Sequence, residues 1–199
     1  MLEVVLASYN KHKAKEIQDV LRGKIRILTL DEIGYNGKIK EDGETLLENA
    51  KIKAKKIREK VKDKIIIADD TGLEVDYLGK APGVYSARFA GEKCSYSDNN
   101  KKLLKLLKEV KFSERKATFR TVIYIIFPDG KETYVEGRVS GFITEKEIGK
   151  NGFGYDPVFY YPPLKKTFAQ LSLKEKNKIS HRSKAIKKAL KVIMHCVKI

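Results

Sequence analysis

The chain has 199 residues, of which 42% are hydrophobic and 34% are charged, and its formal net charge is +16. This composition is typical of a folded globular protein, and the length suits one domain or two closely joined lobes. No apolar run approaches the roughly 20 residues that span a bilayer, and the first residues lack a signal-peptide pattern. We therefore expect a cytoplasmic protein that has no membrane partner.

The two cysteines and the excess of positive charge indicate which metals, disulfides and binding partners to expect. Cys94 and Cys196 lie far apart in the sequence, which predicts neither a zinc cluster nor a disulfide framework. The net charge of +16 indicates either a polyanionic partner, such as nucleic acid or a phosphorylated substrate, or lysine-rich solvated helices. We favour the second interpretation and expect no stable nucleic-acid partner. The lysines interpreted as solvated surface include Lys51, Lys53, Lys55 and Lys56.

The first part of the chain alternates short apolar runs with amphipathic stretches. Residues 2–7 and 25–30 are predicted strands, and apolar residues at three- and four-residue steps predict a helix between them. A continuous apolar stripe predicts a long helix over residues 44–61. Residues 65–68 are uniformly apolar, which predicts a buried central strand that runs directly into residues 69–72.

The second part of the chain ends in long strands and a helix. Residues 79–91 contain Pro and Gly and predict an ordered loop, and a helix is predicted around residues 103–110. Residues 117–127 and 132–143 predict two long strands joined by a Pro-Asp-Gly turn, and residues 181–197 predict the last helix. Early alternation of strands and helices with a late hairpin predicts an α/β fold with a mixed sheet.

A polar segment follows the first predicted strand at the start of the first predicted helix. Free backbone N–H groups and the positive end of the helix dipole favour an anion there, and Lys13 adds a positive charge for phosphate. The alternative is an ordinary helix cap formed by Ser8 or Asn10. The segment consists of Ser8, Tyr9, Asn10, Lys11, His12 and Lys13.

Two adjacent carboxylates, Asp69 and Asp70, come at the end of the predicted buried strand. Ligands of open α/β sheets gather at the carboxyl ends of strands, and adjacent carboxylates repel one another unless a cation or donors offset them. Carboxylate oxygens suit Mg²⁺, and because adjacent side chains on a strand point to opposite faces, we expect only one to reach a metal. The alternative is a turn in which one aspartate caps a backbone amide.

Two further motifs lie in the last third of the chain. Gly152 and Gly154 flank Phe153, an arrangement that lets the backbone approach a flat ligand while the ring stacks on it. Lys176 precedes Ser-His-Arg at residues 180–182, whose donors at a predicted helix start could recognise a carbonyl on a base edge. The structural alternatives are a glycine-rich turn and a capped basic helix.

Together these motifs resemble the inosine triphosphate pyrophosphatase family, whose bacterial members are the non-canonical purine (XTP/dITP) pyrophosphatases. The resemblance covers essentially the whole chain, with similar spacing between motifs. It is carried by Ser8, Asn10 and Lys13, by Asp69-Asp70-Thr71-Gly72-Leu73, by Ala81-Pro82-Gly83 with Ser86-Ala87-Arg88, by Gly152-Phe153-Gly154-Tyr155-Asp156-Pro157, and by Ser180-His181-Arg182.

The resemblance implies hydrolysis of ITP, dITP and XTP to the monophosphate and pyrophosphate with one or more Mg²⁺ ions. Asp70 matches the metal-binding acid and general base, and Glu41 is the second expected metal ligand. Many relatives have two acids where this chain has Lys40-Glu41, so Asp42 stays an alternative. The implied substrate contacts are Ser8, Tyr9, Asn10, Lys11, His12, Lys13, Thr71, Phe153 (stacked on the purine), Gly154, Tyr155, Asp156, Lys176, and His181 and Arg182 near the 6-keto edge.

The resemblance also implies an architecture. We expect a mixed twisted central sheet flanked by helices, in a single two-lobed domain over residues 1–199. The expected molecule is elongated, has its active site in the cleft between the lobes, and forms a homodimer. Two alternatives stay open: a nucleic-acid-binding module that exploits the positive charge, and a related enzyme that acts on modified pyrimidine nucleotides.

Overall fold

The chain folds into an α/β protein, and the computed structural model describes residues 1–21, 23 and 25–197. Near the N-terminus, β1 (Leu2–Leu6) pairs in parallel with β2 (Ile25–Leu28) and with β3 (Ile65–Val75). The other strands are β4 (Pro82–Gly83), β5 (Lys116–Ile126), β6 (Glu132–Ile143), β7 (Phe159–Tyr161) and β8 (Lys166–Thr167). The helices are α1 (Lys11–Leu21), α2 (Leu46–Arg58), α3 (Tyr96–Leu106), α4 (Leu173–Ile179) and α5 (His181–Cys196).

The strands form one eight-stranded sheet in the order β2-β1-β3-β5-β6-β7-β8, and β4 pairs with β3 outside this path. β4, β7 and β8 all join by antiparallel pairing, so the sheet is mixed and the predicted fold class is confirmed. Three elements, β7, β8 and α4, were not predicted, because each is too short to carry a periodic pattern. Among the described residues, no helix combines the length and apolar character that a membrane span requires.

The chain forms two compact units. Unit 1 comprises Met1–Asp70, Thr121–Gly137 and His181–Ile199, and unit 2 comprises Thr71–Arg120 and Arg138–Ser180. Strands β3, β5 and β6 each contribute residues to both units. The active-site cleft expected between two lobes stays a prediction.

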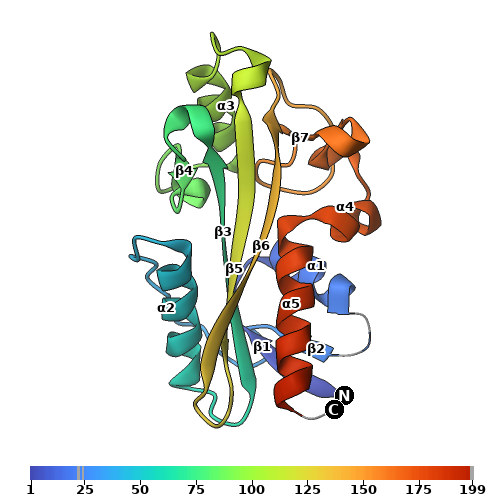
Figure 1. Cartoon of the computed structure of the whole chain (residues 1–199). Helices are drawn as coiled ribbons and strands as arrows, with labels where there is room; N and C mark the ends of the chain where they lie inside the picture. Colours follow the sequence, from blue (N-terminus) through green and yellow to red (C-terminus); the bar gives the residue numbers. More distant parts are fainter. Residues whose placement is uncertain (22, 24, 198–199) are drawn as a thin grey trace. The chain divides into compact units, whose positions relative to one another are not determined.

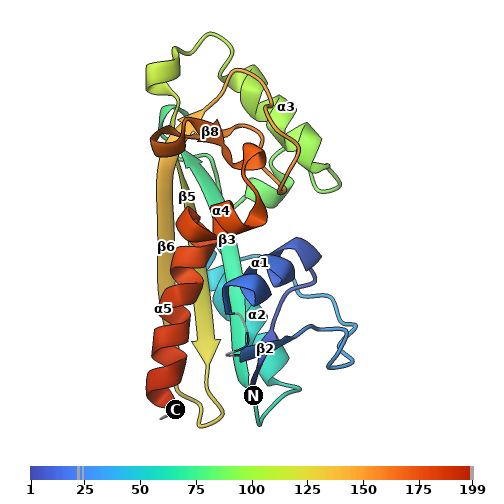
Figure 2. The same ribbon diagram turned by 90° about the vertical axis from the view of Figure 1, so that its right-hand side faces the viewer.

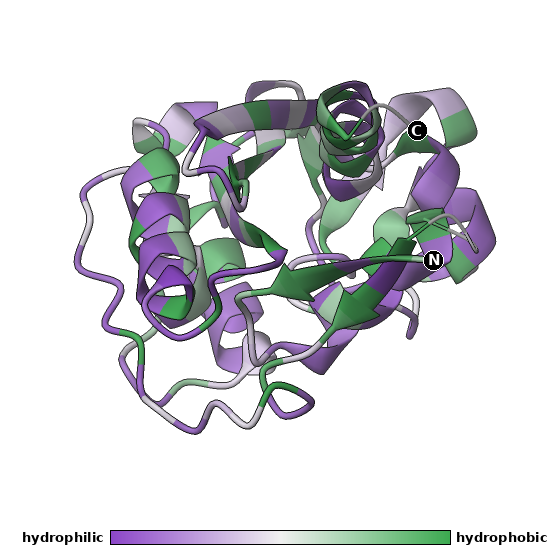
Figure 3. Cartoon of the chain, turned by 90° about the horizontal axis from the view of Figure 1, so that it is seen from below, coloured by the Kyte–Doolittle hydropathy of each residue, from purple (hydrophilic) through white to green (hydrophobic). Residues whose placement is uncertain are grey.

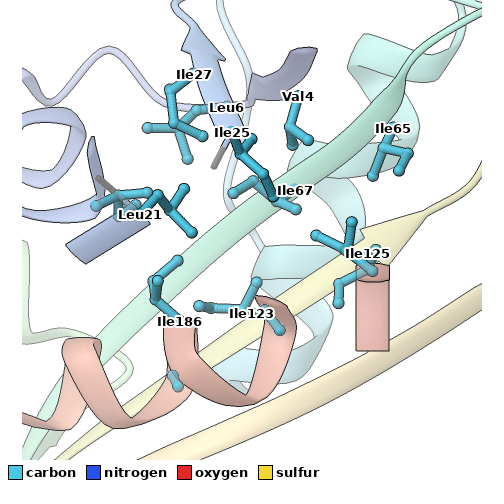
Figure 4. Packing of buried hydrophobic residues seen from close by; sticks show 14 of the residues in the cluster. Val4, Leu6, Leu21, Ile25, Ile27, Ile65, Ile67, Ile123, Ile125 and Ile186 are labelled. Atoms are coloured by element: carbon cyan, nitrogen blue, oxygen red, sulfur yellow. The ribbon is translucent and has the colours of Figure 1, made fainter. Parts of the chain in front are cut away.

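Unit 1 has its core on the strands that were predicted from apolar runs. Figure 1 shows α2 on one side of these strands and α1 and α5 on the other. Because alternate residues of a strand share a face, the i and i+2 residues of four strands meet in one cluster (Figure 4). The cluster includes Val4 and Leu6, Ile25 and Ile27, Ile65 and Ile67, and Ile123 and Ile125, with Ile186 from α5.

The opposite face of the same strands is also covered. Val5 and Ile66 point away from that cluster by alternation, and both are completely buried. Strands that are buried on both faces have uniformly apolar sequences, as Figure 3 shows for the strand that begins at the N-terminus, whereas the helices carry both colours. Each fully buried Val, Leu or Ile contributes roughly 1.5–3 kcal/mol, so this layer fixes the position of the polar residues that follow β1 and interrupt β3.

Several predicted element boundaries were wrong; the helix predicted around residues 103–110, for example, is α3 and spans Tyr96–Leu106. β3 does not end at residue 68 but continues to Val75, because buried cations neutralise the two aspartates within it. The predicted helix over residues 44–61 is shortened to Leu46–Arg58, since Thr45 and Glu48 form a capping box at its start. The predicted loop over residues 79–91 contains β4 and a 3₁₀ helix, Ser86–Arg88.

Unit 2 has an aromatic core. The Phe159 ring lies 4.6 Å from the Phe119 ring and 4.9 Å from the Phe168 ring, measured between centroids, and all three side chains are buried. Leu103 of α3 packs into the same cluster. Aromatic pairs at this spacing contribute beyond their buried area, so these rings provide a rigid base for the polar turn at residues 152–156.

Candidate active site

The polar segment after β1 caps α1. Asn10 Oδ1 accepts hydrogen bonds from the backbone N–H groups of His12 (3.0 Å) and Lys13 (3.2 Å), and Ser8 Oγ accepts one from Asn10 N (3.2 Å). The helix-cap interpretation is therefore correct for Asn10, and phosphate binding by this segment stays a prediction. Lys11 and His12 are exposed on the first turn of α1, whereas Lys13 points inward.

Tyr9 is the exposed member of this segment. Its hydroxyl donates to the backbone oxygens of Tyr35 (3.0 Å) and Gly37 (2.9 Å), while 48% of the residue stays exposed. Tyr9 thus fastens the segment to residues 35–37, which lead toward Glu41. Its predicted contact with a substrate is compatible with that exposure.

Asp69 belongs to a buried network of two cations and two carboxylates. Lys13 Nζ lies 3.2 Å from Asp69 Oδ2, and Arg182 Nε donates to the same oxygen at 3.2 Å. Arg182 Nη1 also donates to Glu16 Oε2. Burial by itself would raise the pKa of Asp69, but the charges of Lys13 and Arg182 hold it far below its usual range. The network is balanced in charge and ties α1, β3 and α5 together.

Asp70 belongs to a second cluster. Lys53 Nζ donates to Asp70 Oδ1 at 2.9 Å and to Glu41 Oε2 at 2.6 Å. The Lys53 side chain is only 6% exposed, the Asp70 side chain 11% and the Glu41 side chain 38%, so the cluster opens toward solvent at Glu41. Burial raises the pKa of Asp70, although the Lys53 ammonium opposes this shift.

The two neighbouring aspartates bind partners from different helices. Asp69 contacts Lys13 of α1 and Arg182 of α5, whereas Asp70 contacts Lys53 of α2. Figure 2 shows α1 in front of β3, and in Figure 1 both α1 and α5 lie on the side of the strands away from α2. This arrangement follows from the alternation of side chains along a strand, and it leaves Asp70 rather than Asp69 next to Glu41.

The Asp70 cluster has the chemistry that a hard cation requires. Two carboxylates converge on one ammonium, so the cluster of Asp70, Glu41 and Lys53 carries one excess negative charge. Mg²⁺ is commonly held by one or two carboxylates and completes its shell with water and substrate phosphates. The described residues contain no group of three His, Cys, Asp or Glu side chains that could hold a metal by themselves. The donor set therefore fits Mg²⁺ that arrives with a phosphate ligand.

In unit 2, the glycine-rich motif forms a turn that presents Phe153. Gly152 and Gly154 have φ angles of +75° and +62°, the left-handed region that favours glycine. Asp156 Oδ2 accepts a 2.8 Å hydrogen bond from Phe153 N and also binds Lys176 Nζ. The Lys176 ammonium lies 5.0 Å from the centre of the Phe153 ring. The structure thus brings together Phe153, Asp156 and Lys176, three predicted site residues.

Tyr155 and Thr71 have different surroundings. The Tyr155 hydroxyl donates to Ser86 O at 2.9 Å, and burial raises the pKa of this phenol. Ser86 Oγ in turn accepts from Leu73 N and donates to Gly83 O. Tyr155 therefore anchors the turn from inside the core, as a support of the predicted pocket. Thr71 follows Asp70 on β3 and is half-buried.

Lys176, His181 and Arg182 come from two consecutive helices, and their shared contact with a substrate stays a prediction. Lys176 lies within α4 and belongs to unit 2, whereas His181 and Arg182 begin α5 and belong to unit 1. Ser180, which follows α4 and precedes α5, separates them because its extended backbone ends α4. His181 and Arg182 are both buried, and the Arg182 guanidinium binds two carboxylates. Its contact with a base stays a prediction.

Sequence reasoning missed two charged residues of unit 1. Lys53 was interpreted as solvated surface but is 5% exposed, because it lies seven residues after Leu46 on the buried face of α2. Glu16 adjoins Ile17 on the buried face of α1 and is 4% exposed. In both helices, the position of the charged residue on the same face as the apolar residues was the signal that could have identified it as buried.

Comparison with known proteins gives one consistent result. The chain matches a family described as the Ham1 family over residues 4–192. It is 51% identical over 195 residues to the dITP/XTP pyrophosphatase of Caldanaerobacter subterraneus subsp. tengcongensis, covering 98% of this chain and 97% of that protein. It is 43% identical to the dITP/XTP pyrophosphatase of Bacillus subtilis, and the match covers 97% of this chain and 98% of that protein. A solved HAM1 protein from Coxiella burnetii has 38% identity and a TM-score of 0.87, covering 98% and 100% of the two chains.

Proposed function

We propose, from the premise that this chain belongs to the Ham1 family, that it hydrolyses non-canonical purine nucleoside triphosphates to the monophosphate and pyrophosphate. Its substrates are dITP, XTP and ITP. The family match and the relatives named dITP/XTP pyrophosphatase confirm the resemblance found in the sequence motifs. The enzyme is thus a hydrolase of phosphate anhydride bonds.

The proposed hydrolysis is supported by one observation in particular: the carboxylates of Asp70 and Glu41 both bind Lys53 Nζ. Hydrolysis between the α- and β-phosphates requires neutralisation of negative charge and an oriented water more than it requires covalent chemistry. Asp70 and Glu41 would hold Mg²⁺, which when bound neutralises phosphate charge. Lys13, the inward-pointing lysine of α1, supplies further positive charge toward phosphate.

Asp70 also acts as the base in this proposal. Its burial raises the pKa of the carboxyl group, and a base works best when its pKa lies near the working pH. The hydrogen bond from Lys53 Nζ to Asp70 Oδ1 fixes the orientation of the carboxylate. Asp70 then accepts the proton of the attacking water, and Lys53 keeps the carboxylate from turning away.

Recognition of the base is assigned to the Phe153 turn. The ring provides a stacking face, and the buried Lys176 ammonium beside it provides hydrogen-bond donors. A 6-carbonyl, as in hypoxanthine or xanthine, accepts such donors, whereas the 6-amino group of adenine leaves them unpaired. Mismatches of this kind discriminate strongly between substrates.

A hydrolysis screen tests the proposal. The purified chain is incubated with dITP, XTP, ITP, ATP, GTP, dTTP and UTP, each with and without Mg²⁺, and both products are quantified. We expect pyrophosphate from the first three nucleotides, little from ATP, and dependence on the metal. Equal turnover of dTTP and UTP would favour the pyrimidine alternative, and no turnover with salt-dependent duplex binding would favour the nucleic-acid module.

The proposal includes the state in which the enzyme works. Members of the resembled family usually form homodimers, and we infer a homodimer that uses Mg²⁺ and binds no nucleic acid stably. Its substrates belong to the nucleotide pool, so we place the enzyme in the cytoplasm. Sedimentation equilibrium measures the oligomeric state, and cell fractionation followed by detection of the chain measures the compartment; a monomer or a secreted product would contradict these inferences.

A further inference from the structure

An exposed aromatic side chain adjoins the predicted stacking ring. Tyr96 is the first residue of α3, and its ring centre lies 5.9 Å from that of Phe153, with 48° between the ring planes. The Tyr96 residue is 42% exposed. A large aromatic side chain that is neither buried nor isolated, and that meets a ligand-facing ring, is typical of a recognition surface.

The position of Tyr96 is fixed by how α3 packs on the Phe153 turn. Tyr96, Asn100 and Leu103 follow one another at four- and three-residue steps and therefore share a helix face. Leu103 is completely buried in the aromatic core, and Asn100 Nδ2 donates to Gly154 O at 3.2 Å and to Glu147 Oε1 at 2.6 Å. The same face thus binds the backbone of the turn one helical step away from Tyr96.

The start of the helix is also well defined. Ser95 caps α3 and forms a capping box with Asp98, in which each side chain accepts a hydrogen bond from the other residue's backbone N–H. With its first turn fixed in this way, α3 presents the Tyr96 ring to Phe153 with little conformational freedom to lose. A preorganised ring contributes more to binding than a mobile one.

We propose that Tyr96 is a second aromatic contact of the base, so that the planar base of the substrate is held by the Phe153–Tyr96 pair. This inference rests on the proposed function and names a residue that the sequence motifs did not include. The pair recognises a flat heteroaromatic ring, whereas the polar edge of that ring is left to Lys176. Tyr96 therefore affects binding of nucleotides that carry a base and leaves binding of pyrophosphate unchanged.

A single fluorescent residue tests this directly, because the chain contains no tryptophan. Tyr96→Trp places the sole tryptophan at the proposed contact, and Tyr77→Trp is the matched control, since Tyr77 is an exposed tyrosine (57%) of the same unit. The probes are inosine 5′-monophosphate and inorganic pyrophosphate. We expect inosine monophosphate to quench the fluorescence of Tyr96→Trp. Pyrophosphate should not quench the fluorescence of this variant, and neither probe should quench that of Tyr77→Trp. Equal quenching of Tyr96→Trp by both probes would overturn the proposal. So would the absence of quenching by inosine monophosphate at concentrations at which it inhibits turnover.

Kinetics provides the second measurement. Tyr96→Ala is expected to raise KM for dITP about five- to tenfold with kcat within about twofold, because a lost stacking contact weakens binding of the base. Tyr96→Phe is expected to keep the wild-type KM, since the ring supplies the contact. An unchanged KM in Tyr96→Ala, with a wild-type unfolding midpoint, would contradict the assignment. Failure of the proposed function would give a different result from failure of the Tyr96 assignment, because the wild-type protein would then release no pyrophosphate from dITP.

Discussion

Two buried sets of charges, one in each unit, are built differently. In unit 1, Asp69 is shared by Lys13 and Arg182, and Arg182 also binds Glu16, so four residues from three elements depend on one another. In unit 2, Lys176 and Asp156 form one ion pair beside the Phe153 ring. The first set joins elements of the fold, whereas the second holds a cation against an aromatic face. Burial of charge therefore does not by itself identify a binding residue; the surroundings of the charge do.

Asp70 extends the comparison, because it adjoins the unit 1 network without belonging to it. Its side chain binds Lys53, which also binds Glu41, and these three residues together carry one more negative charge than positive charge. The Asp69 network is buried, whereas the Asp70 cluster is partly exposed at Glu41. Neighbouring residues of one strand thus bind partners on different helices, because alternation turns their side chains to opposite faces.

The largest expected effect comes from Asp70→Asn. Removal of the proposed base is expected to lower kcat/KM for dITP by about 10²–10⁴-fold, while the protein stays folded. The control is Asp129→Asn, an exposed residue of the β5–β6 turn that pairs with Lys131. Pyrophosphate release measures the rate. Near-wild-type activity in Asp70→Asn would remove Asp70 from the catalytic role and make its cluster purely structural.

The second effect is on the free energy of unfolding, which we expect to differ between substitutions in the Asp69 network of unit 1 and in the Lys176–Asp156 pair of unit 2. Arg182→Met leaves Asp69 and Glu16 with less compensation, and removal of one partner from a buried ion pair costs about 3–5 kcal/mol. Lys176→Met removes the ammonium from Asp156, which keeps the hydrogen bond from Phe153 N, and is therefore expected to cost less than Arg182→Met. The exposed Arg26→Met, which breaks pairs to Glu3 and Glu32, is expected to cost under about 1 kcal/mol. Urea unfolding measures all three, and equal losses would show that the networks do not differ.

The third effect concerns Phe153 and affects binding. Phe153→Ala is expected to weaken substrate binding by roughly 1–3 kcal/mol, the usual contribution of stacking between a base and an aromatic ring. KM for dITP rises accordingly, with a smaller change in kcat. Phe112→Ala is the matched control, because Phe112 is an exposed phenylalanine of unit 2 that stacks on Phe142. A KM that is unchanged in Phe153→Ala would reject stacking on this ring.

The smallest effect is a difference in pH dependence between the two aspartates. Because its pKa is lowered in the folded state, Asp69 stabilises the fold above its unfolded pKa of about 4, and this contribution is lost as pH falls through the folded value. Asp70 has a raised pKa, so its ionisation costs stability at neutral pH, and this cost disappears in acid. Asp69→Asn should therefore reduce the loss of stability between pH 7 and pH 3, and Asp70→Asn should increase it. Urea midpoints of the wild type and both variants at the two pH values measure the loss of stability, and changes of the same sign in both variants relative to the wild type would contradict these assignments.

Much of the fold was predictable because its signals are local. The apolar runs of β1 and β3 and the hairpin of β5 and β6 are visible as uninterrupted or alternating hydrophobic residues, and the capping box of α2 is a four-residue pattern. The motifs that resemble a known family are local in the same way. Among the candidate site residues, these signals pointed to Asp70, Phe153 and Asp156, together with the cap at Asn10.

The partners of the charged residues were decided by tertiary structure. Arg182 meets Glu16 across 166 positions of sequence and Asp69 across 113, and Lys53 meets Glu41 and Asp70 only because α2 packs against β3. No periodicity encodes such a pairing, since it depends on which helix covers which face of the sheet. The order of residues along the chain specified which segments are apolar and which motifs carry polar groups. Packing determined which charges neutralise one another, because only burial makes an unpaired charge costly enough to require a specific partner.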